Sequence, residues 1–354
     1  MLSLFPENLI FKYGNPGSPY PKDIDGQKIG FYRSWKPILI KEGFYHFFLG
    51  LESYLEFQKK LSLLAEEPVG VSLALSCMVE VNVAGGILYH AKSNQENNQT
   101  PMQESFTKKM LESLWDGFRE GGPTKIFAVG VSEPGWETKL RKLSSKVVNG
   151  KLSGTKSFIT NGAEADTIFW VTKNEDTNPV YLVHRFKNNK KSGGNETTLE
   201  NQISEELFHT DFTPFVTHLK LTLCEYPISM EDLLLDNYGK LGIELRLKEL
   251  LSLVSLLIGK SKKVSLENER VAEEREKLVM WRENYLISCD GNPNSELLLS
   301  GFPYPTEGLL QALSSHWNLS SPKDLKNVDP DYQLFVWEDQ FTKVLIQKKN
   351  RKQL

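Results

Sequence analysis

The chain changes character near residue 125, and this change constrains the fold more than any other feature of the sequence. Five short segments rich in β-branched and aromatic residues follow between 126 and 186, separated by turn residues, and a sixth lies at 216–224. Asn149-Gly150 lies between two such segments and is the strongest short signal for a β-hairpin. The sequence therefore predicts a β region enclosed by helical regions, which is an α+β multidomain architecture.

The region before the β segments has the apolar spacing of helices. Between residues 52 and 122, the apolar residues from Phe106 to Phe118 recur at intervals that place them on one stripe. Gly121-Gly122-Pro123 then ends the helical pattern.

The region after the β segments is also predicted to be helical. Few helix breakers occur from 241 to about 285, and a dense apolar block lies at 250–258. A last amphipathic helix is predicted at 332–347. The remaining segments, 187–204, 291–305 and 320–330, are predicted to be loops.

Charge and composition narrow the class of partner. The 354 residues include 42 Lys and Arg against 45 Asp and Glu, which gives a net charge of -3. Without a basic surplus, no global field attracts nucleic acid, so nucleic-acid binding is not expected. Hydrophobic residues at 40% and charged residues at 25% are typical of folded globular chains. The six histidines form no His-x-x-x-His pair, so no metal site is expected.

Two further features bear on location. Cys77, Cys224 and Cys289 are widely spaced, which indicates reduced thiols and a cytoplasmic protein. The most apolar stretch, 70–89, carries Glu80 and Asn82 near its centre, where a membrane span would rarely tolerate them. We therefore predict a buried helix there and no membrane partner.

Two motifs occur in order within the β region. The first is Ser132-Glu133-Pro134-Gly135, and the second, about twenty residues later, runs from Asn149-Gly150 through Gly154-Thr155-Lys156 to Phe158-Ile159-Thr160-Asn161-Gly162. Each alone is compatible with ordinary turns of a β domain. Together they resemble the acyl-CoA dehydrogenase family, whose middle domain has a Thr/Ser-Glu-Pro-Gly turn followed by an Asn-Gly, Gly-x-Lys, Trp/Phe-Ile-Thr-Asn-Gly series.

The resemblance implies three domains: an N-terminal helical domain at 1–123, a middle antiparallel β-barrel at 124–236, and a shortened C-terminal helical bundle at 237–354. It also implies FAD as cofactor and an acyl-CoA thioester as substrate. A homo-oligomer, dimer or tetramer, is expected, with an electron-transfer flavoprotein as a candidate partner. The reaction implied is α,β-dehydrogenation of the acyl group.

The residues of these motifs suit a flavin on chemical grounds. An isoalloxazine ring needs a flat apolar surface and hydrogen-bonding groups at its edge. Phe158 and Thr160 alternate along a strand and so share one face, where they offer a ring and a hydroxyl. Val131 and Ser132, before the Pro-Gly turn, offer backbone N–H groups and a second hydroxyl. We predict that these four residues bind FAD.

The substrate side departs from the family pattern. Where the family has Ala-Gly-Ser-Asp, this chain has Trp136-Glu137-Thr138-Lys139. Thr138 keeps a hydroxyl at the position of the family's Ser, which implies a substrate-binding role. Trp136 is bulky, and Lys139 reverses a charge.

Arg275 is a candidate for a cofactor contact between subunits. An ungapped comparison with the family from Glu249 to Leu278 places Gly259 on a helix-packing glycine and Arg275 on an arginine that reaches the FAD of a neighbouring subunit. A guanidinium suits a pyrophosphate because it can form two parallel hydrogen bonds. The alternative is that Arg275 belongs to a charged helix surface.

The catalytic base is the remaining requirement, because removal of an acyl α-proton needs a positioned carboxylate. The C-terminal Tyr-Glu-Gly-Thr segment of most family members is absent. Some members instead carry a Glu-Arg pair at the start of the first bundle helix, and Glu249 falls there, followed by Leu250 rather than Arg. Glu249 is therefore the candidate base. The alternatives are a solvated helical carboxylate and, for the whole protein, a catalytically silent relative used for binding or assembly.

Overall fold

The structure, a computed structural model, describes residues 30–98, 109–122, 124–135, 139–185, 202–208, 210–289 and 293–336, with 343, 345–347 and 349–350 near the C-terminus. The chain divides into two compact units. Unit 1 comprises the described residues of Met1–Met78, Thr210–Val216 and Ile243–Leu354, and unit 2 those of Val79–His209 and Thr217–Gly242. Helices from both ends of the chain thus share unit 1. The division into 1–123, 124–236 and 237–354 stays a prediction.

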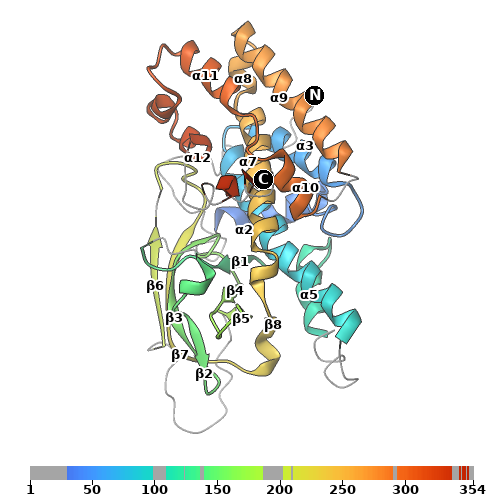
Figure 1. Ribbon diagram of the computed structural model, residues 1–354, viewed down its shortest axis with the longest axis vertical. Coiled ribbons are helices and arrows are strands. Elements are labelled where there is room, and N and C mark those ends of the chain that lie inside the picture. The colour runs from blue at the N-terminus through green and yellow to red at the C-terminus, as the bar shows by residue number, and fades with distance from the viewer. Residues whose placement is uncertain are drawn as a thin grey trace. The chain divides into compact units, whose positions relative to one another are not determined.

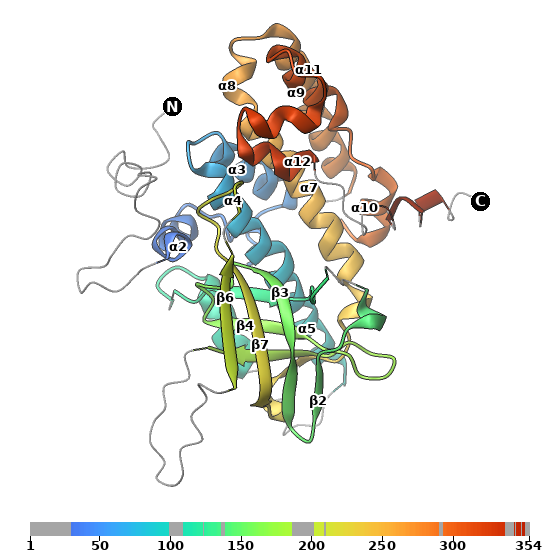
Figure 2. The same ribbon diagram turned by 90° about the vertical axis from the view of Figure 1, so that its left-hand side faces the viewer.

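Unit 2 contains two four-stranded β-sheets (Figures 1 and 2). One has the strand order β1-β4-β5-β8, formed by β1 (Phe127–Gly130), β4 (Thr167–Val171), β5 (Val180–His184) and β8 (Leu233–Leu235). The other has the order β2-β3-β7-β6, formed by β2 (Lys146–Val148), β3 (Lys151–Thr160), β7 (His218–Pro227) and β6 (Ile203–Phe208). Every residue of β4 is buried, so this strand forms part of the core. The predicted β region is confirmed.

The strand pairing differs in one respect from the antiparallel arrangement predicted. β1 pairs with β4 in parallel, with Phe127 opposite Thr167, whereas the other strand pairs are antiparallel. Parallel neighbours need a long connection, because the chain must return to its starting side. The 36 residues between β1 and β4 provide this connection and contain strands β2 and β3.

The hairpin between β2 and β3 turns where the sequence predicts. Asn149 and Gly150 have φ angles of 50° and 71°, which are the left-handed values that a two-residue hairpin turn requires. Val148 pairs with Lys151 directly across this turn. The Asn-Gly prediction is confirmed.

Strand β6 begins inside the segment predicted to be a loop, 187–204, and this part of the prediction is wrong. Residues 187–201 of that segment lie outside the described residues. The four central residues of β6 are exposed, so it lacks the alternation of a half-buried strand. It is held by its antiparallel pairing with β7, from Ile203 opposite Leu223 to Phe208 opposite His218. Two ion pairs add to this pairing: Arg185 to Glu205 at 2.5 Å, and Lys220 to Glu206 at 2.8 Å.

A long buried helical segment precedes the sheets. It consists of α4 (Gly70–Val79), the π-helical turn η1 (Glu80–Ala84) and α5 (Gly85–Asn98). Among the described residues, Gly70–Ser93 is one helix long and apolar enough to cross a membrane, but 94% of its apolar window is buried inside the protein. The buried carboxylate of Glu80 accepts a hydrogen bond of 2.8 Å from the N–H of Phe127, the first residue of β1. The predicted buried helix is confirmed.

A shorter helix follows, at 109–115, with the 3₁₀ turn η2 (Asp116–Phe118) after it. Leu111, Leu114 and Phe118 are buried, as the predicted apolar stripe requires. Phe106 lies outside the described residues.

Unit 1 is helical. Its N-terminal part contains α2 (Phe31–Lys41), α3 (Tyr54–Ala65) and most of α4. Its C-terminal part contains α7 (Gly242–Lys260), α8 (Lys262–Ser265), α9 (Glu269–Ser288), α10 (Ser295–Gly301), α11 (Glu307–His316), η7 (Pro322–Asn327), η8 (Pro330–Tyr332) and α12 (Gln333–Val336). Helices were predicted through 285 and again at 332–347; of the latter, residues 337–342 and 344 lie outside the described residues.

Two loop predictions in this unit are wrong. Helix α10 lies within 291–305. Asn294 caps its N-terminus, and the Asn294 side chain accepts hydrogen bonds from the N–H groups of Glu296 and Leu297. The 3₁₀ helix η7 lies within 320–330, where the side chain of Ser321 caps it. Both elements are short, and short helices depend on caps and packing more than on periodicity.

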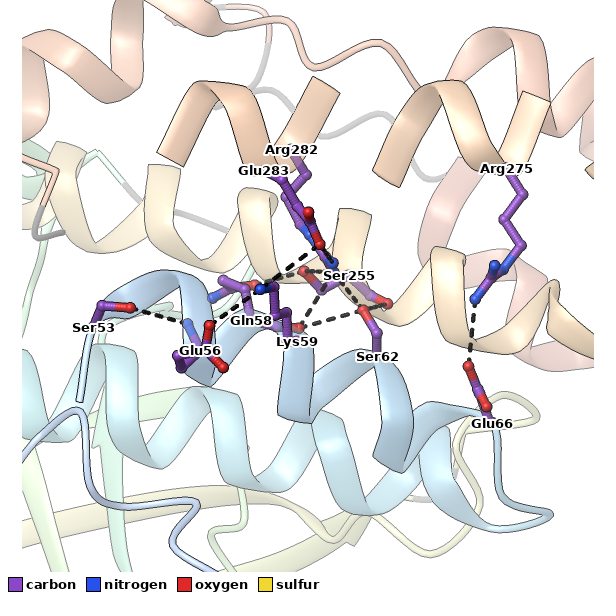
Figure 3. A network of polar contacts seen from close by, with 10 residues as sticks. All are labelled: Ser53, Glu56, Gln58, Lys59, Ser62, Glu66, Ser255, Arg275, Arg282 and Glu283. Carbon is purple, nitrogen blue, oxygen red and sulfur yellow. Dashed lines mark hydrogen bonds and ion pairs between the residues drawn. The ribbon is translucent and has the colours of Figure 1, made fainter. Parts of the chain in front are cut away.

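A buried polar network joins three helices of unit 1 (Figure 3). The amide of Gln58 on α3 donates to Ser252 and accepts from Ser255 on α7, both at 2.8 Å. Arg282 on α9 donates to the hydroxyl of Ser62 at 2.5 Å and to that of Ser255 at 3.2 Å. These contacts satisfy polar groups that the helix interface excludes from water.

Gly259 on α7 fits the helix-packing role that the resemblance implies. A Cβ atom at Gly259 would lie 2.1 Å from the carbonyl oxygen of Ser62, so α3 and α7 approach too closely there for any side chain. The apolar block at 250–258 is largely buried within the chain, including Leu251, Leu256 and Leu257. The block therefore does not by itself require a second subunit to cover it.

Candidate functional site

Val131 and Ser132 lie directly after β1, and β3 holds their backbone in place. The N–H of Ser157 donates to the carbonyl oxygen of Ser132 at 2.9 Å. The ammonium group of Lys156 donates to the carbonyl oxygen of Val131 at 3.1 Å. Both carbonyl groups are thus bonded to β3, and the segment before the Pro-Gly turn is fixed against the strand that carries Phe158 and Thr160.

A buried ion pair strengthens this attachment. Lys156 and Glu133 lie 3.0 Å apart, with side chains 0% and 4% exposed. The second oxygen of Glu133 accepts hydrogen bonds from the N–H and hydroxyl of Ser144, at 2.6 and 2.7 Å, and the first accepts from the N–H of Ser145 at 2.9 Å. The carboxylate therefore ties the turn after β1 to both β3 and the segment that enters β2.

Both members of this pair are charged at neutral pH. Burial alone would raise the pKa of Glu133, but Lys156 and the hydrogen bonds from Ser145 and Ser144 outweigh burial and lower the pKa to about 2. Burial lowers the pKa of Lys156 to about 8, although Glu133 opposes this shift. The sequence places both residues in the two motifs, but residue spacing does not reveal that they pair.

Gly130 makes room for the lysine. A Cβ atom at Gly130 would lie 2.9 Å from Cγ of Lys156 and 3.6 Å from Cδ1 of Ile159. The side chain of Lys156 therefore packs against the backbone of β1 at Gly130, where any larger residue would collide with it. The ammonium group ends 5.7 Å from the ring centroid of Trp170 on β4.

Phe158, Thr160 and His218 lie together at one end of the β3 and β7 pair. Thr160 pairs directly with His218 across the two strands, and paired side chains project to the same face. The rings of Phe158 and His218 are stacked, with centroids 4.1 Å apart and planes inclined by 24°. This face presents a phenyl ring, a hydroxyl and an imidazole, of which the first two could be predicted from the sequence.

His218 is the polar group of this face whose bonding is incomplete. It is 2% exposed, and within the part of the chain that the structure describes neither of its ring nitrogens has a hydrogen-bond partner. The neighbouring Thr217 hydroxyl is likewise buried without a partner there. Burial lowers the pKa of His218 to about 4, so the imidazole is neutral at pH 7. A flat group with hydrogen-bonding edges would satisfy such a ring, and the isoalloxazine of FAD fits this description.

The other predicted residues lie in unit 1. Arg275 on α9 donates from Nε to the carbonyl oxygen of Ile258 at 2.8 Å, and its Nη2 lies 3.3 Å from Glu66. Burial lowers the pKa of this guanidinium, with Glu66 opposing the shift. Arg275 therefore has partners within its own chain that link α9 to the ends of α7 and α3.

Glu249 lies on α7 and is partly exposed. Its carboxylate lies 3.5 Å from the guanidinium of Arg246, one helical turn before it. An arginine one helical turn before Glu249 is thus its ion-pair partner, a contact that the i, i+3 spacing in the sequence could have indicated. Trp136 and Thr138 lie outside the described residues. The described residues contain no group of three or more His, Cys, Asp or Glu side chains that could hold a metal ion.

Comparison with solved structures identifies the fold. The butyryl-CoA dehydrogenase of Megasphaera elsdenii is 13% identical over 82% of this chain and 77% of its own, with a TM-score of 0.56. The prolyl acyl carrier protein oxidase AnaB is 12% identical over 90% of both chains, with a TM-score of 0.57. The FAD complex of PigA is 12% identical over 91% of this chain and 98% of its own, with a TM-score of 0.51.

No protein-family model and no curated protein matches the sequence. The protein nevertheless has the acyl-CoA dehydrogenase fold, as the two motifs predicted. At identities this low the similarity concerns the fold, and the chemistry has to be argued from the residues of this chain.

Proposed function

We propose that this protein is an FAD flavoprotein that removes hydrogen from the α and β carbons of an acyl thioester. The observation that carries the proposal is the face formed by Phe158, Thr160 and His218, because its buried imidazole lacks a partner that a flavin edge could supply. Support comes from the fold, which this chain shares with a butyryl-CoA dehydrogenase and with a protein solved as an FAD complex.

In this proposal each residue has a distinct part. When bound, FAD accepts the hydride that leaves the β carbon. Phe158 supplies a flat apolar surface, Thr160 and Ser132 supply hydroxyl groups, and Val131 contributes its backbone. The Glu133–Lys156 ion pair positions Val131 and Ser132 without itself touching the ligand.

Glu249 is the proposed base and would remove the α-proton. Arg246, 3.5 Å away, would hold the carboxylate in one orientation. We further propose that Thr138 binds the substrate through its hydroxyl. Arg275 is proposed to contact the FAD of a second subunit, in exchange for its present partner Glu66.

The cofactor is tested by denaturing the purified protein and measuring released flavin. We expect about one FAD per chain after reconstitution with excess FAD. A protein that stays colourless after that treatment rejects the proposed function. Thr160→Ala should weaken FAD retention by about 1 kcal/mol, the scale of one hydrogen bond.

The reaction is tested by mixing the FAD-loaded protein anaerobically with saturated acyl thioesters and following loss of the flavin's visible absorbance. The panel should include thioesters of CoA and of an acyl carrier protein, since the fold is shared with an acyl carrier protein oxidase. Glu249→Gln keeps the size of the side chain but removes its basicity, and general base catalysis contributes typically 10²–10⁴-fold. Bleaching at an unchanged rate in Glu249→Gln rejects Glu249 as the base.

The second candidate is a catalytically silent relative that serves binding or assembly. Two features of the sequence favour it: the Tyr-Glu-Gly-Thr segment that carries the base in most members of the family is absent, and Glu249 is followed by Leu250 rather than by Arg. Bound FAD without bleaching by any thioester would support this candidate. A cytoplasmic location, a homo-oligomer and electron transfer to an electron-transfer flavoprotein stay predictions, and light scattering at micromolar concentration tests the oligomer.

A further inference from the structure

The polar atoms of His218 need an explanation. More than nine in ten buried polar groups in proteins have a hydrogen-bond partner, and an exception in a native fold points to strain, to water or to a missing ligand. His218 begins β7, is 2% exposed, and lacks a partner at both ring nitrogens among the described residues. Packing alone needs only an apolar ring at this buried position, so the two buried nitrogens point to a hydrogen-bonding ligand.

The surroundings of His218 restrict the ligand. Its stacked neighbour is Phe158, its cross-strand neighbours are Thr160 on β3 and Phe208 on β6, and none of the three carries a charge. The nearest charges in the strand register are Glu206 and Lys220, which pair with each other two residues further along. Because burial also keeps the ring itself neutral, this site suits a neutral planar group with polar edges rather than a phosphate.

A neutral imidazole has one N–H donor and one acceptor nitrogen. The pyrimidine edge of an isoalloxazine carries carbonyl acceptors beside an N–H donor, so it can meet both requirements at once. Phe158 and Thr160, the residues that resemble the flavin-binding segment of the fold, are in direct contact or direct register with His218. The imidazole is therefore placed at the same end of the sheet as the residues to which FAD binding was assigned.

We propose that His218 is a flavin-binding residue, which hydrogen-bonds the polar edge of the isoalloxazine beside Thr160. This proposal rests on the proposed function, because it takes FAD as the ligand. It adds a residue that neither motif contains, and it predicts that the unpartnered nitrogens become bonded when FAD binds.

The experiment compares three variants with the wild type. His218→Phe keeps an aromatic ring stacked on Phe158 but removes both nitrogens. His218→Gln keeps one donor and one acceptor. His90→Phe is the matched control, because His90 is a histidine of the same unit on α5, stacked edge-on against Tyr89. Each protein is prepared without FAD and then titrated with FAD.

Three quantities are measured: the FAD dissociation constant, the position of the visible absorbance bands of bound FAD, and the thermal midpoint of the FAD-free protein. We expect His218→Phe to weaken FAD binding about tenfold and to shift the absorbance bands, because a hydrogen bond to the ring edge is lost. We expect its FAD-free midpoint to stay equal or rise, since a buried unpaired polar group has been removed. His218→Gln should retain most of the affinity, and His90→Phe should match the wild type.

The outcomes separate this proposal from the function on which it rests. A wild type that binds no FAD overturns both. A wild type that binds FAD while His218→Phe shows the affinity and spectrum of His90→Phe overturns the role of His218 alone. If His218→Phe fails to fold, the decision passes to His218→Leu, which also removes both nitrogens. In a folded His218→Leu protein, an FAD dissociation constant raised about tenfold together with shifted absorbance bands supports the proposal, whereas the affinity and spectrum of His90→Phe overturn the role of His218.

Discussion

Lys156 in unit 2 and Arg282 in unit 1 are both cations with side chains almost completely buried, at 0% and 3% exposure, yet the protein compensates them differently. Lys156 faces a carboxylate, Glu133, at 3.0 Å. Arg282 donates to hydroxyl and carbonyl groups of Ser62, Ser255 and Gln58, and the nearest carboxylate, Glu283, lies at 3.8 Å.

The difference follows from what each site must do. A carboxylate with several donors fixes a loop. Glu133 ties the turn after β1 to β3 through Lys156, and to the segment that enters β2 through Ser144 and Ser145. The neutral partners of Arg282 let one guanidinium donate hydrogen bonds to two helices, α3 and α7, without burying a second charge. Burial lowers the pKa of Arg282 only to about 10, so it stays charged at neutral pH. The first arrangement is the more sensitive to losing one partner, because a charge is then left buried and uncompensated.

The largest effect is expected from Lys156→Met. It leaves Glu133 buried without its cation, which should lower the free energy of unfolding by about 3–5 kcal/mol. The double variant Lys156→Met with Glu133→Gln should recover most of this loss, because no charge remains. Urea unfolding measures both variants. If the single and double variants were equally unstable, the ion pair would not be the source of the effect.

The second largest effect is expected from lowering the pH, which should destabilise the site that contains Glu133. The pKa of Glu133 is about 2 in the folded protein against an ordinary 4.5, so the stability it contributes is present above pH 4.5 and is lost as the pH falls toward 2. The full loss is on the order of 3 kcal/mol. The double variant at Lys156 and Glu133 should not show this pH-dependent loss of stability when unfolding is measured between pH 5 and pH 3. An identical pH profile in wild type and double variant would contradict the assignment.

Arg282→Met should cost less, about 2 kcal/mol, because Gln58 and Ser255 keep their mutual hydrogen bond and only bonds to the cation are lost. Hydrogen exchange of the α3 and α7 amides measures the change locally. Lys263→Met, an exposed cation on α8 of the same unit, is the control and should leave exchange of these amides unchanged. If Arg282→Met lost as much stability as Lys156→Met, the loss would not depend on whether the partners of the buried cation are neutral groups or a carboxylate.

The smallest effect is expected from Ser144→Ala. It removes the hydroxyl bond of Ser144 to Glu133 while the backbone N–H bond at 2.6 Å remains, so about 1 kcal/mol should be lost. Thermal unfolding at pH 7 is sufficient to measure it. Ser157→Ala, whose hydroxyl lies 3.4 Å from its acceptor, should change the midpoint less.

Local patterns could be predicted from the sequence, whereas long-range partners could not. The Asn149-Gly150 turn requires only two residues that tolerate left-handed backbone angles, so its position is visible in the sequence. Strand β6 was not predicted, because exposed charged residues hide its period. Helix α10 was not predicted either, since a seven-residue helix begun by one Asn cap shows little periodicity.

In the candidate site, too, local features could be predicted from the sequence and long-range partners could not. Phe158 and Thr160 could be proposed from alternation along one strand. The partners that give the site its chemistry are 23 residues apart for Glu133 and Lys156, and 60 residues apart for Phe158 and His218. Such pairs depend on strand register, which a single sequence does not fix. Arg246 is the exception, because its distance from Glu249 is one helical turn.

The charged strand β6 has a consequence for how copies of this protein can meet. It is an edge strand of its sheet, and edge strands expose backbone groups to which a second chain can add. Glu205 and Glu206 on β6, each held by a cation from a neighbouring segment, would face the same charges on an identical strand. Charged side chains on an edge strand oppose the addition of a second strand, so we expect this edge to resist aggregation by sheet extension.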